Sequence, residues 1–250
     1  MNELMVILLI VILILFAMWL YKKVLTRQTK MRLGITQILN DGAIVEARDQ
    51  DIIASSELPF DGNLLASFFA TYLTMRESKG AGNWSGLISA YLFQWEIDGL
   101  IKTTIDADNR LRIRFIDEVR PMIDIELELY DILKSNDIAE FDFDLLRDWS
   151  KKVLAVGEQE LLETEDAAFD QKGRIRFTRG GYEKSLSHGS FIKYWISLSL
   201  TTFNQLDDHR QKQELIFALL LELTDEIQVF VNENNKACDI LEIANRVGQF

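Results

Sequence analysis

Residues 84–116 read WSGLISAYLFQWEIDGLIKTTIDADNRLRIRFI, and in them a helical pattern changes abruptly into a strand pattern. The apolar side chains of the first half recur at helical spacing and form one face: Leu87, Ile88, Tyr91, Leu92 and Trp95. Gly99 follows in the position of a helix-ending glycine. Beyond it, apolar and polar residues alternate at 100–105 and 111–116, on either side of a polar turn. The segment therefore predicts a helix that leads into a β-hairpin.

A second helix is expected immediately upstream. Pro59 marks a boundary, because the residue before a proline avoids helical backbone angles. Residues 64–75 (LLASFFATYLTM) then form a compact apolar run. Helix, helix and hairpin follow in the order of a winged-helix module, which we expect to span residues 58–120.

The same order recurs further along the chain. Helices are predicted at 123–133, 143–153 and 158–169, and a strand is predicted at 173–178. The tetrapeptide Arg-Ile-Arg-Phe occurs in both expected hairpins, at 112–115 and 174–177. We therefore expect a second winged-helix-like module at 121–182.

The remaining soluble segments are a linker and a helical region. Residues 23–57 are expected to be a basic juxtamembrane segment and linker, with one strand at 43–46. Residues 183–250 are expected to be helical at 191–203, 213–231 and 239–247. Charges interrupt the first two of these runs before the roughly 20 apolar residues that a membrane span needs, so they are expected to be core helices. The predicted fold class is mainly α with small β-hairpins (α+β), in tandem winged-helix-like modules and a C-terminal helical pair.

The N-terminus predicts a membrane anchor within residues 1–22. Residues 4–21 (LMVILLIVILILFAMWLY) contain no charge, and such a helix would be about 27 Å long, close to the thickness of a bilayer core. The positive residues follow this run, whereas a cleavable signal peptide carries them before it. They predict an outside N-terminus and a cytoplasmic body in a single-pass cell-membrane protein. These charges either determine topology alone or also bind anionic lipid headgroups. The basic residues are Lys22, Lys23, Arg27, Lys30 and Arg32.

Composition argues against several kinds of site. The net charge of −12 repels phosphate backbones and disfavours nucleic acid as a partner. With one cysteine and with His188 and His209 far apart, no metal-ligand pattern is present. The serines around His188 read as a polar loop, and the glycines at 80, 82 and 86 lack the pattern of a P-loop. We expect no catalytic residues, no metal and no cofactor.

The helices expected to read DNA are acidic. The helix from Trp84 carries Glu96 and Asp98, and the stretch from Glu158 to Asp170 carries six acids and no base. A helix that reads a DNA groove needs donors to phosphates and bases, so a protein partner is favoured. The candidate partner surface consists of Trp84, Glu158, Glu160, Glu163, Glu165 and Asp166. Alternatively, Trp84 staples the start of its helix.

Arginines alternate along both expected hairpins. They could touch a phosphate backbone, but we expect them to form solvated faces that pair with nearby carboxylates. These arginines are Arg110, Arg112, Arg114, Arg174, Arg176 and Arg179.

Five segments resemble the C-terminal cytoplasmic region of a bacterial membrane-protein family known as domain of unknown function 2207. They are Leu58-Pro59, GLISAYLFQWEIDGLIKTT (86–104), IDIELELYDIL (123–133), FIKYWISLSL (191–200) and ELIFALLLELTDEIQVF (214–230). The resemblance covers about two thirds of the chain and implies a cytoplasmic location and this order of elements. That family has no established activity. It carries a bulky extracytoplasmic domain before its membrane segment, whereas Met1–Glu3 alone precede the segment here.

These observations favour a membrane-anchored adaptor whose lipid contact is residues 4–21 and whose protein partner is another membrane or extracytoplasmic protein. The alternative is a membrane-tethered winged-helix DNA-binding regulator. A third hypothesis is an enzyme whose site is assembled from scattered residues.

Overall fold

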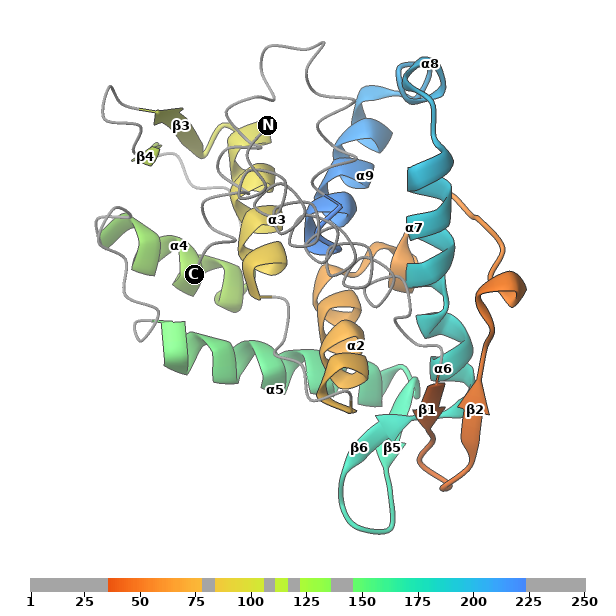
Figure 1. The fold of residues 1–250 in the computed structure, drawn as a ribbon. Helices are drawn as coiled ribbons and strands as arrows, with labels where there is room; N and C mark the ends of the chain where they lie inside the picture. Colours follow the sequence, from red (N-terminus) through yellow and green to blue (C-terminus); the bar gives the residue numbers. More distant parts are fainter. Residues whose placement is uncertain (1–35, 78–83, 106–110, 117–121, 136–145, 224–250) are drawn as a thin grey trace, which may run out of the picture. The chain divides into compact units, whose positions relative to one another are not determined.

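The computed structural model describes residues 36–77, 84–105, 111–116, 122–135 and 146–223, all within one compact unit, Gly34–Phe250 (Figure 1). Its helices are α2 (Leu64–Glu77), α3 (Trp84–Ile97), α4 (Asp124–Ser135), α5 (Arg147–Glu163), α6 (Arg179–Ser185), α7 (Ser187–Ser197), α8 (Leu200–Phe203) and α9 (Asp208–Leu220). Short 3-10 turns lie at Asp49–Asp51 and Pro59–Gly62.

The strands form three antiparallel hairpins: β1 (Thr36–Ile38) with β2 (Ile44–Glu46), β3 (Ile101–Ile105) with β4 (Leu111–Phe115), and β5 (Ala167–Phe169) with β6 (Ile175–Phe177). Each hairpin is a separate two-stranded sheet. The predicted fold class, mainly α with small β-hairpins, is confirmed at this level.

Two helix pairs build the core. α2 packs on α5, and α3 packs on α9. Gly157 lies where α5 crosses α2, and a Cβ atom there would come within 2.7 Å of the Phe69 Cβ. The expected modules at 58–120 and 121–182 therefore share a packing interface.

Helix α4 joins helix α3 to the β3–β4 hairpin. Tyr130 donates its hydroxyl hydrogen to the Ile116 carbonyl at 3.0 Å, and its ring meets that of Phe115 edge-on at 5.0 Å. Trp95 donates its indole N–H to Glu126 at 2.8 Å, and both side chains are buried. These contacts satisfy the polar groups that the packing of α3 against α4 removes from water.

The prediction of separate helices at 143–153 and 158–169 is wrong. One helix, α5, runs from Arg147 to Glu163, and residues 167–169 form β5. Gly157 does not end the helix, because it is the contact point with α2 and strong helix formers follow it. Residues 143–145 lie outside the described residues.

The N-terminal linker contains two strands, whereas one was predicted. β1 pairs with β2 so that Thr36 faces Glu46 and Ile38 faces Ile44. The turn between them contains Asp41, which accepts a hydrogen bond from the Ala43 amide, and Gly42 with φ of 86°. An Asp-Gly pair is a hairpin signal, and it accounts for the strand that the prediction missed.

Two predicted helices of the C-terminal region have different bounds. The one expected at 191–203 begins earlier, at Ser187, and breaks after Ser197; α8 follows, with Ser199 as its N-cap. The one expected at 213–231 is α9, which starts at Asp208 behind the cap Asp207 and ends at Leu220. Glu222, with φ of 55°, turns the chain away from helical geometry. The helix predicted at 239–247 lies outside the described residues.

Within the described ranges, no helix has both the length and the apolar character to span a bilayer. The predicted anchor at residues 1–22 and its basic flank, which includes Lys22, Lys23, Arg27, Lys30 and Arg32, lie outside those ranges.

Candidate partner surface

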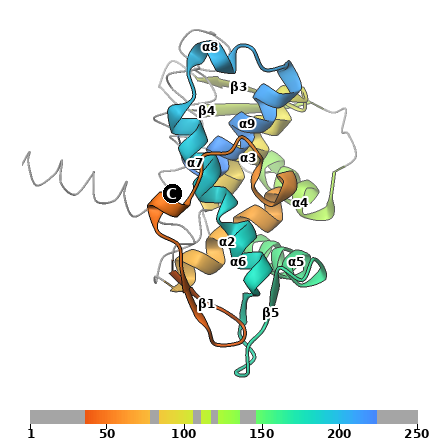
Figure 2. The ribbon, with the colours of Figure 1, turned by 90° about the vertical axis from the view of Figure 1, so that its right-hand side faces the viewer.

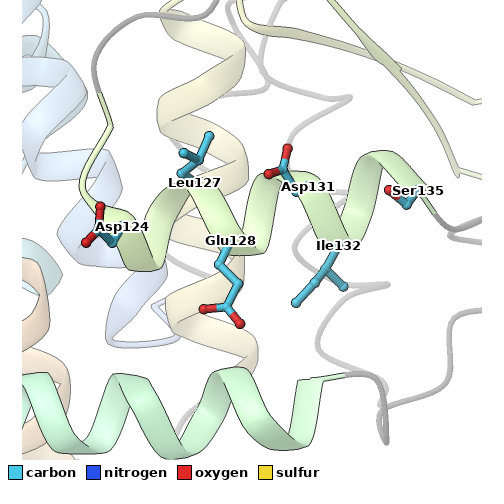
Figure 3. A pocket seen from close by; sticks show the side chains of 6 residues that line it. All are labelled: Asp124, Leu127, Glu128, Asp131, Ile132 and Ser135. Carbon is cyan, nitrogen blue, oxygen red and sulfur yellow. The ribbon is translucent and has the colours of Figure 1, made fainter.

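Helix α4 carries an acidic and apolar surface with a shallow hollow along it (Figure 3). Glu128 and Ile132 point toward α5 in this view, whereas Leu127 and Asp131 project from the other side of α4. Glu128 forms an ion pair with Lys152 of α5, with 2.7 Å between Oε1 and Nζ. We call the hollow and its lining the α4 surface: Asp124, Leu127, Glu128, Asp131, Ile132 and Ser135.

The sequence of α4 accounts for this surface. Ile125, Leu129 and Leu133 recur every four residues and are buried, so they form the inward stripe. Leu127 falls off that stripe and remains 39% exposed, beside the exposed carboxylates of Asp124 and Asp131. Ile123, just before the helix, is 54% exposed. The sequence predicted only a helix at 123–133; the signal for its open face was Leu127, an apolar residue outside the four-residue stripe.

Trp84, the aromatic residue of the predicted surface, is half-buried at the first position of α3. Its ring lies 4.8 Å from Phe68 of α2 and 6.0 Å from Trp149 of α5, between ring centroids. This position agrees with the alternative in which Trp84 staples the start of its helix.

The predicted acidic residues do not share one helix. Glu158, Glu160 and Glu163 belong to α5, whereas Glu165, at φ of 58°, and Asp166 follow its end. Glu158 is half-buried, and Glu163 and Glu165 are exposed.

Two of these carboxylates hold the fold together. Glu160 accepts a hydrogen bond from the Asn63 side chain at 2.8 Å, which ties α5 to the start of α2. Asp166 is buried and accepts from Thr164 at 2.8 Å and from Lys184 at 3.2 Å. A partner can therefore reach Glu163 and Glu165 more readily than Glu160 or Asp166.

The two arginine-bearing hairpins differ. Asp170 forms ion pairs with Arg174 at 2.9 Å and Arg176 at 3.0 Å, so the expected pairing is confirmed in β5–β6. The Arg174 amide donates a hydrogen bond to the Asp170 carboxylate, and the two guanidinium groups also donate to it. These hydrogen bonds outweigh the effect of burial and hold the pKa of the Asp170 carboxyl well below its usual range.

In β3–β4, Lys102 lies directly opposite Arg114, and both are exposed. Neither forms an ion pair in the part of the chain that the structure describes, and the acids nearest in sequence to this hairpin lie outside that part, so the expected pairing of Arg114 stays a prediction. Arg179 is exposed and also forms no ion pair there. The side chains of Arg110 and Arg112 lie outside the described residues.

The segment around His188 is helical and buried, not an exposed polar loop. His188 is 2% exposed in α7, and burial lowers its pKa to about 4, although the nearby Ser185 carbonyl opposes this shift. Ser185 donates its hydroxyl hydrogen to the Tyr182 carbonyl at 2.7 Å, and Ser190 donates to that of Leu186 at 3.3 Å. These hydroxyls are engaged with the backbone. His209 is exposed.

A buried carboxylate at Glu214 escaped the sequence analysis. Its side chain is 0% exposed in α9 and accepts a hydrogen bond from Arg210 Nε at 2.8 Å and one from Tyr194 at 3.3 Å. Burial raises the pKa of the Glu214 carboxyl, and Arg210 opposes the shift. A glutamate at the start of an apolar run (ELIFALLL) was the available signal. Across the described residues, no three metal-ligating side chains come together.

Comparisons with protein-family models, curated proteins and solved structures find no match. The resemblance in hydrophobic pattern therefore stays a prediction.

Proposed function

We propose that this chain is a membrane-anchored cytoplasmic protein-interaction module without catalytic activity, and that it docks a partner on the α4 surface. The observation that supports this most is the combination on α4 of exposed apolar side chains with unburied carboxylates. Protein interfaces join an apolar centre to a polar rim, and this surface has both elements. The complementary partner is a basic, amphipathic segment of another membrane or extracytoplasmic protein.

Residues 4–21 supply the membrane contact in this proposal, with the N-terminus outside and the body in the cytoplasm. A shared membrane raises the effective concentration of two tethered proteins, so a modest docking surface is sufficient for association.

The test is co-purification of the full-length protein from membranes in mild detergent, with partners identified by mass spectrometry. A D124K/D131K variant reverses the charge of the α4 surface, and E163K/E165K reverses two exposed acids at the end of α5 as a matched control. We expect a stoichiometric partner that D124K/D131K loses and E163K/E165K keeps. If the partner is lost only with E163K/E165K, docking occurs at the end of α5. If no stoichiometric partner is recovered, the proposal fails.

A second candidate is a membrane-tethered winged-helix regulator that binds DNA. It is favoured by the order of α2, α3 and the β3–β4 hairpin, and by Lys102 opposite Arg114 on the outer face of that hairpin. Like charges directly opposite on a hairpin are destabilising, which an anionic ligand would offset. DNA retention that weakens steeply with salt and disappears in K102Q/R114Q would support this function. Retention unchanged in that variant would exclude this hairpin as the contact.

A further inference from the structure

The β1–β2 and β5–β6 hairpins lie side by side (Figures 1 and 2). The Asn40 amide donates to the Phe177 carbonyl at 3.0 Å, and Arg176 Nη1 donates to the Ile38 carbonyl at 3.3 Å. The two hairpins thus form one surface, residues 36–46 and 167–177, which we call the hairpin platform.

The outer face of β1–β2 carries an exposed isoleucine pair beside the exposed Glu46, where only polar residues are expected. The strand register places Ile38 opposite Ile44, and they are 41% and 74% exposed. Gln37, which points to the other face, is buried at 3% exposure. A hairpin with one face on a core ordinarily turns its polar residues to water, so this exposed isoleucine pair indicates a second contact.

The neighbouring hairpin adds an aromatic residue and positive charge. Phe169, at the end of β5, is 55% exposed. The acids of the platform, Asp41, Glu46 and Asp170, are balanced in number by Lys172, Arg174 and Arg176, of which the two arginines pair with Asp170, whereas the whole chain carries −12. The platform is therefore a part of this acidic protein that an anionic surface does not repel.

The position of the platform in the chain indicates what covers it. β1 begins at Thr36, and the predicted membrane segment ends at Tyr21. Residues 22–35 span at most roughly 50 Å when fully extended, and their basic residues favour the headgroup layer. The platform is thus the described surface with the shortest connection to the bilayer.

We propose that the hairpin platform docks on the cytoplasmic surface of an anionic bilayer, with Ile38, Ile44 and Phe169 in the headgroup layer. This inference rests on the anchor of the proposed function. Apolar and aromatic side chains with flanking cations are the composition that interfacial membrane contacts use. Docking would restrain the body and fix which of its surfaces faces the cytoplasm.

The experiment places an environment-sensitive fluorophore on single cysteines of the full-length C238S protein, in nanodiscs of phosphatidylcholine and phosphatidylserine that contain a doxyl-labelled quencher lipid. The test positions are I38C and I44C. The control is I196C, because Ile196 is 42% exposed, like Ile38, and lies near the end of α7 that leads to α8. Both views show α8 at the opposite end from β1. Circular dichroism verifies that each variant is folded.

We expect blue-shifted emission and lipid quenching at positions 38 and 44, and neither at position 196. Adding F169D to I38C should reduce the quenching. Carbonate extraction separates this inference from the anchor: protein that resists extraction but shows no quenching overturns the docking alone, and protein that is extracted overturns both. If the blue shift occurs without quenching and vanishes when each nanodisc holds one chain, a second copy covers the platform and the lipid contact is excluded.

Discussion

His188 shows how one buried side chain determines the response of the fold to pH. Its Nδ1 lies 3.0 Å from the Ser185 carbonyl, and Nε2 has no hydrogen-bond partner among the described residues. Its ring centroid lies 5.5 Å from that of Phe60, in the turn before α2. The folded protein therefore holds this imidazole neutral, with a pKa of about 4, against 6.5 in a solvent-exposed chain.

Acidification should weaken the fold through His188. Because its pKa is lower in the folded state, its contribution is complete above pH 6.5 and is lost as the pH falls toward 4, by up to roughly 3 kcal/mol. Denaturant unfolding at several pH values checks this. H188N keeps a donor toward Ser185 but does not titrate, so its stability should change less between pH 6.5 and 5. Parallel curves for the two proteins would contradict the prediction.

Two adjacent glycines have opposite steric requirements. A Cβ atom on Gly181 would overlap the backbone of Asp166, whereas one on Gly180 would meet nothing closer than 3.9 Å. We expect G181A to lower the free energy of unfolding by about 3 kcal/mol through overpacking, and G180A to be neutral or stabilising by up to about 1 kcal/mol. Thermal and urea unfolding measure both, and equal effects would show that the approach of the Asp166 backbone to α6 is not tight.

At the scale of elements, the continuity of α5 matters most. Helix propensity alone favours alanine over glycine at position 157 by about 1 kcal/mol. The close crossing with α2 has the opposite effect, because the new Cβ would press on Phe69. We expect G157A to destabilise the protein by about 1–2 kcal/mol. A155G, at an exposed position of the same helix, measures propensity alone and should cost about 1 kcal/mol. A stabilised G157A protein would mean that the helices can separate without cost.

At the scale of the whole molecule, segment 47–58 is tied across the C-terminal helices. The Ser55 amide donates to the Ser190 carbonyl at 3.1 Å, Lys193 donates to that of Ile52 at 3.0 Å, and Arg210 donates to that of Ser56. Arg210 also neutralises the buried Glu214 carboxylate. The Arg210 side chain therefore joins segment 47–58 to the buried carboxylate of α9.

Removing that cation should be costly. R210M leaves Glu214 without its ionic partner, and we expect a loss of about 3 kcal/mol in unfolding free energy. The double variant R210M/E214Q removes the buried charge as well and should regain much of this loss. Guanidinium unfolding of the two variants distinguishes the outcomes; equal stabilities would show that water reaches Glu214.

Local sequence predicts the elements that obey one periodicity. Helix α3 was predicted to begin at Trp84 and to end before Gly99, as it does, and the β3–β4 hairpin was predicted within one residue at each strand. Their patterns depend on residues a few positions apart, and Gly99, at φ of 72°, ends the helix as expected. The net charge and the apolar run at 4–21 are likewise properties of the sequence itself.

Tertiary packing determined the remainder. The sequence predicted a break between two helices near Gly157, whereas in the structure Gly157 contacts Phe69 of α2 within one helix. The sequence predicted a polar loop around His188, whereas the turn before α2 covers this side chain. The α4 surface likewise depends on which neighbours remove a side chain from water. The pairing of Asp170 with Arg174 and Arg176 is local to one hairpin and could be predicted. Periodicity shows which residues share a face, but burial depends on segments distant in the chain, so the sequence could identify the elements and not the surfaces they leave open.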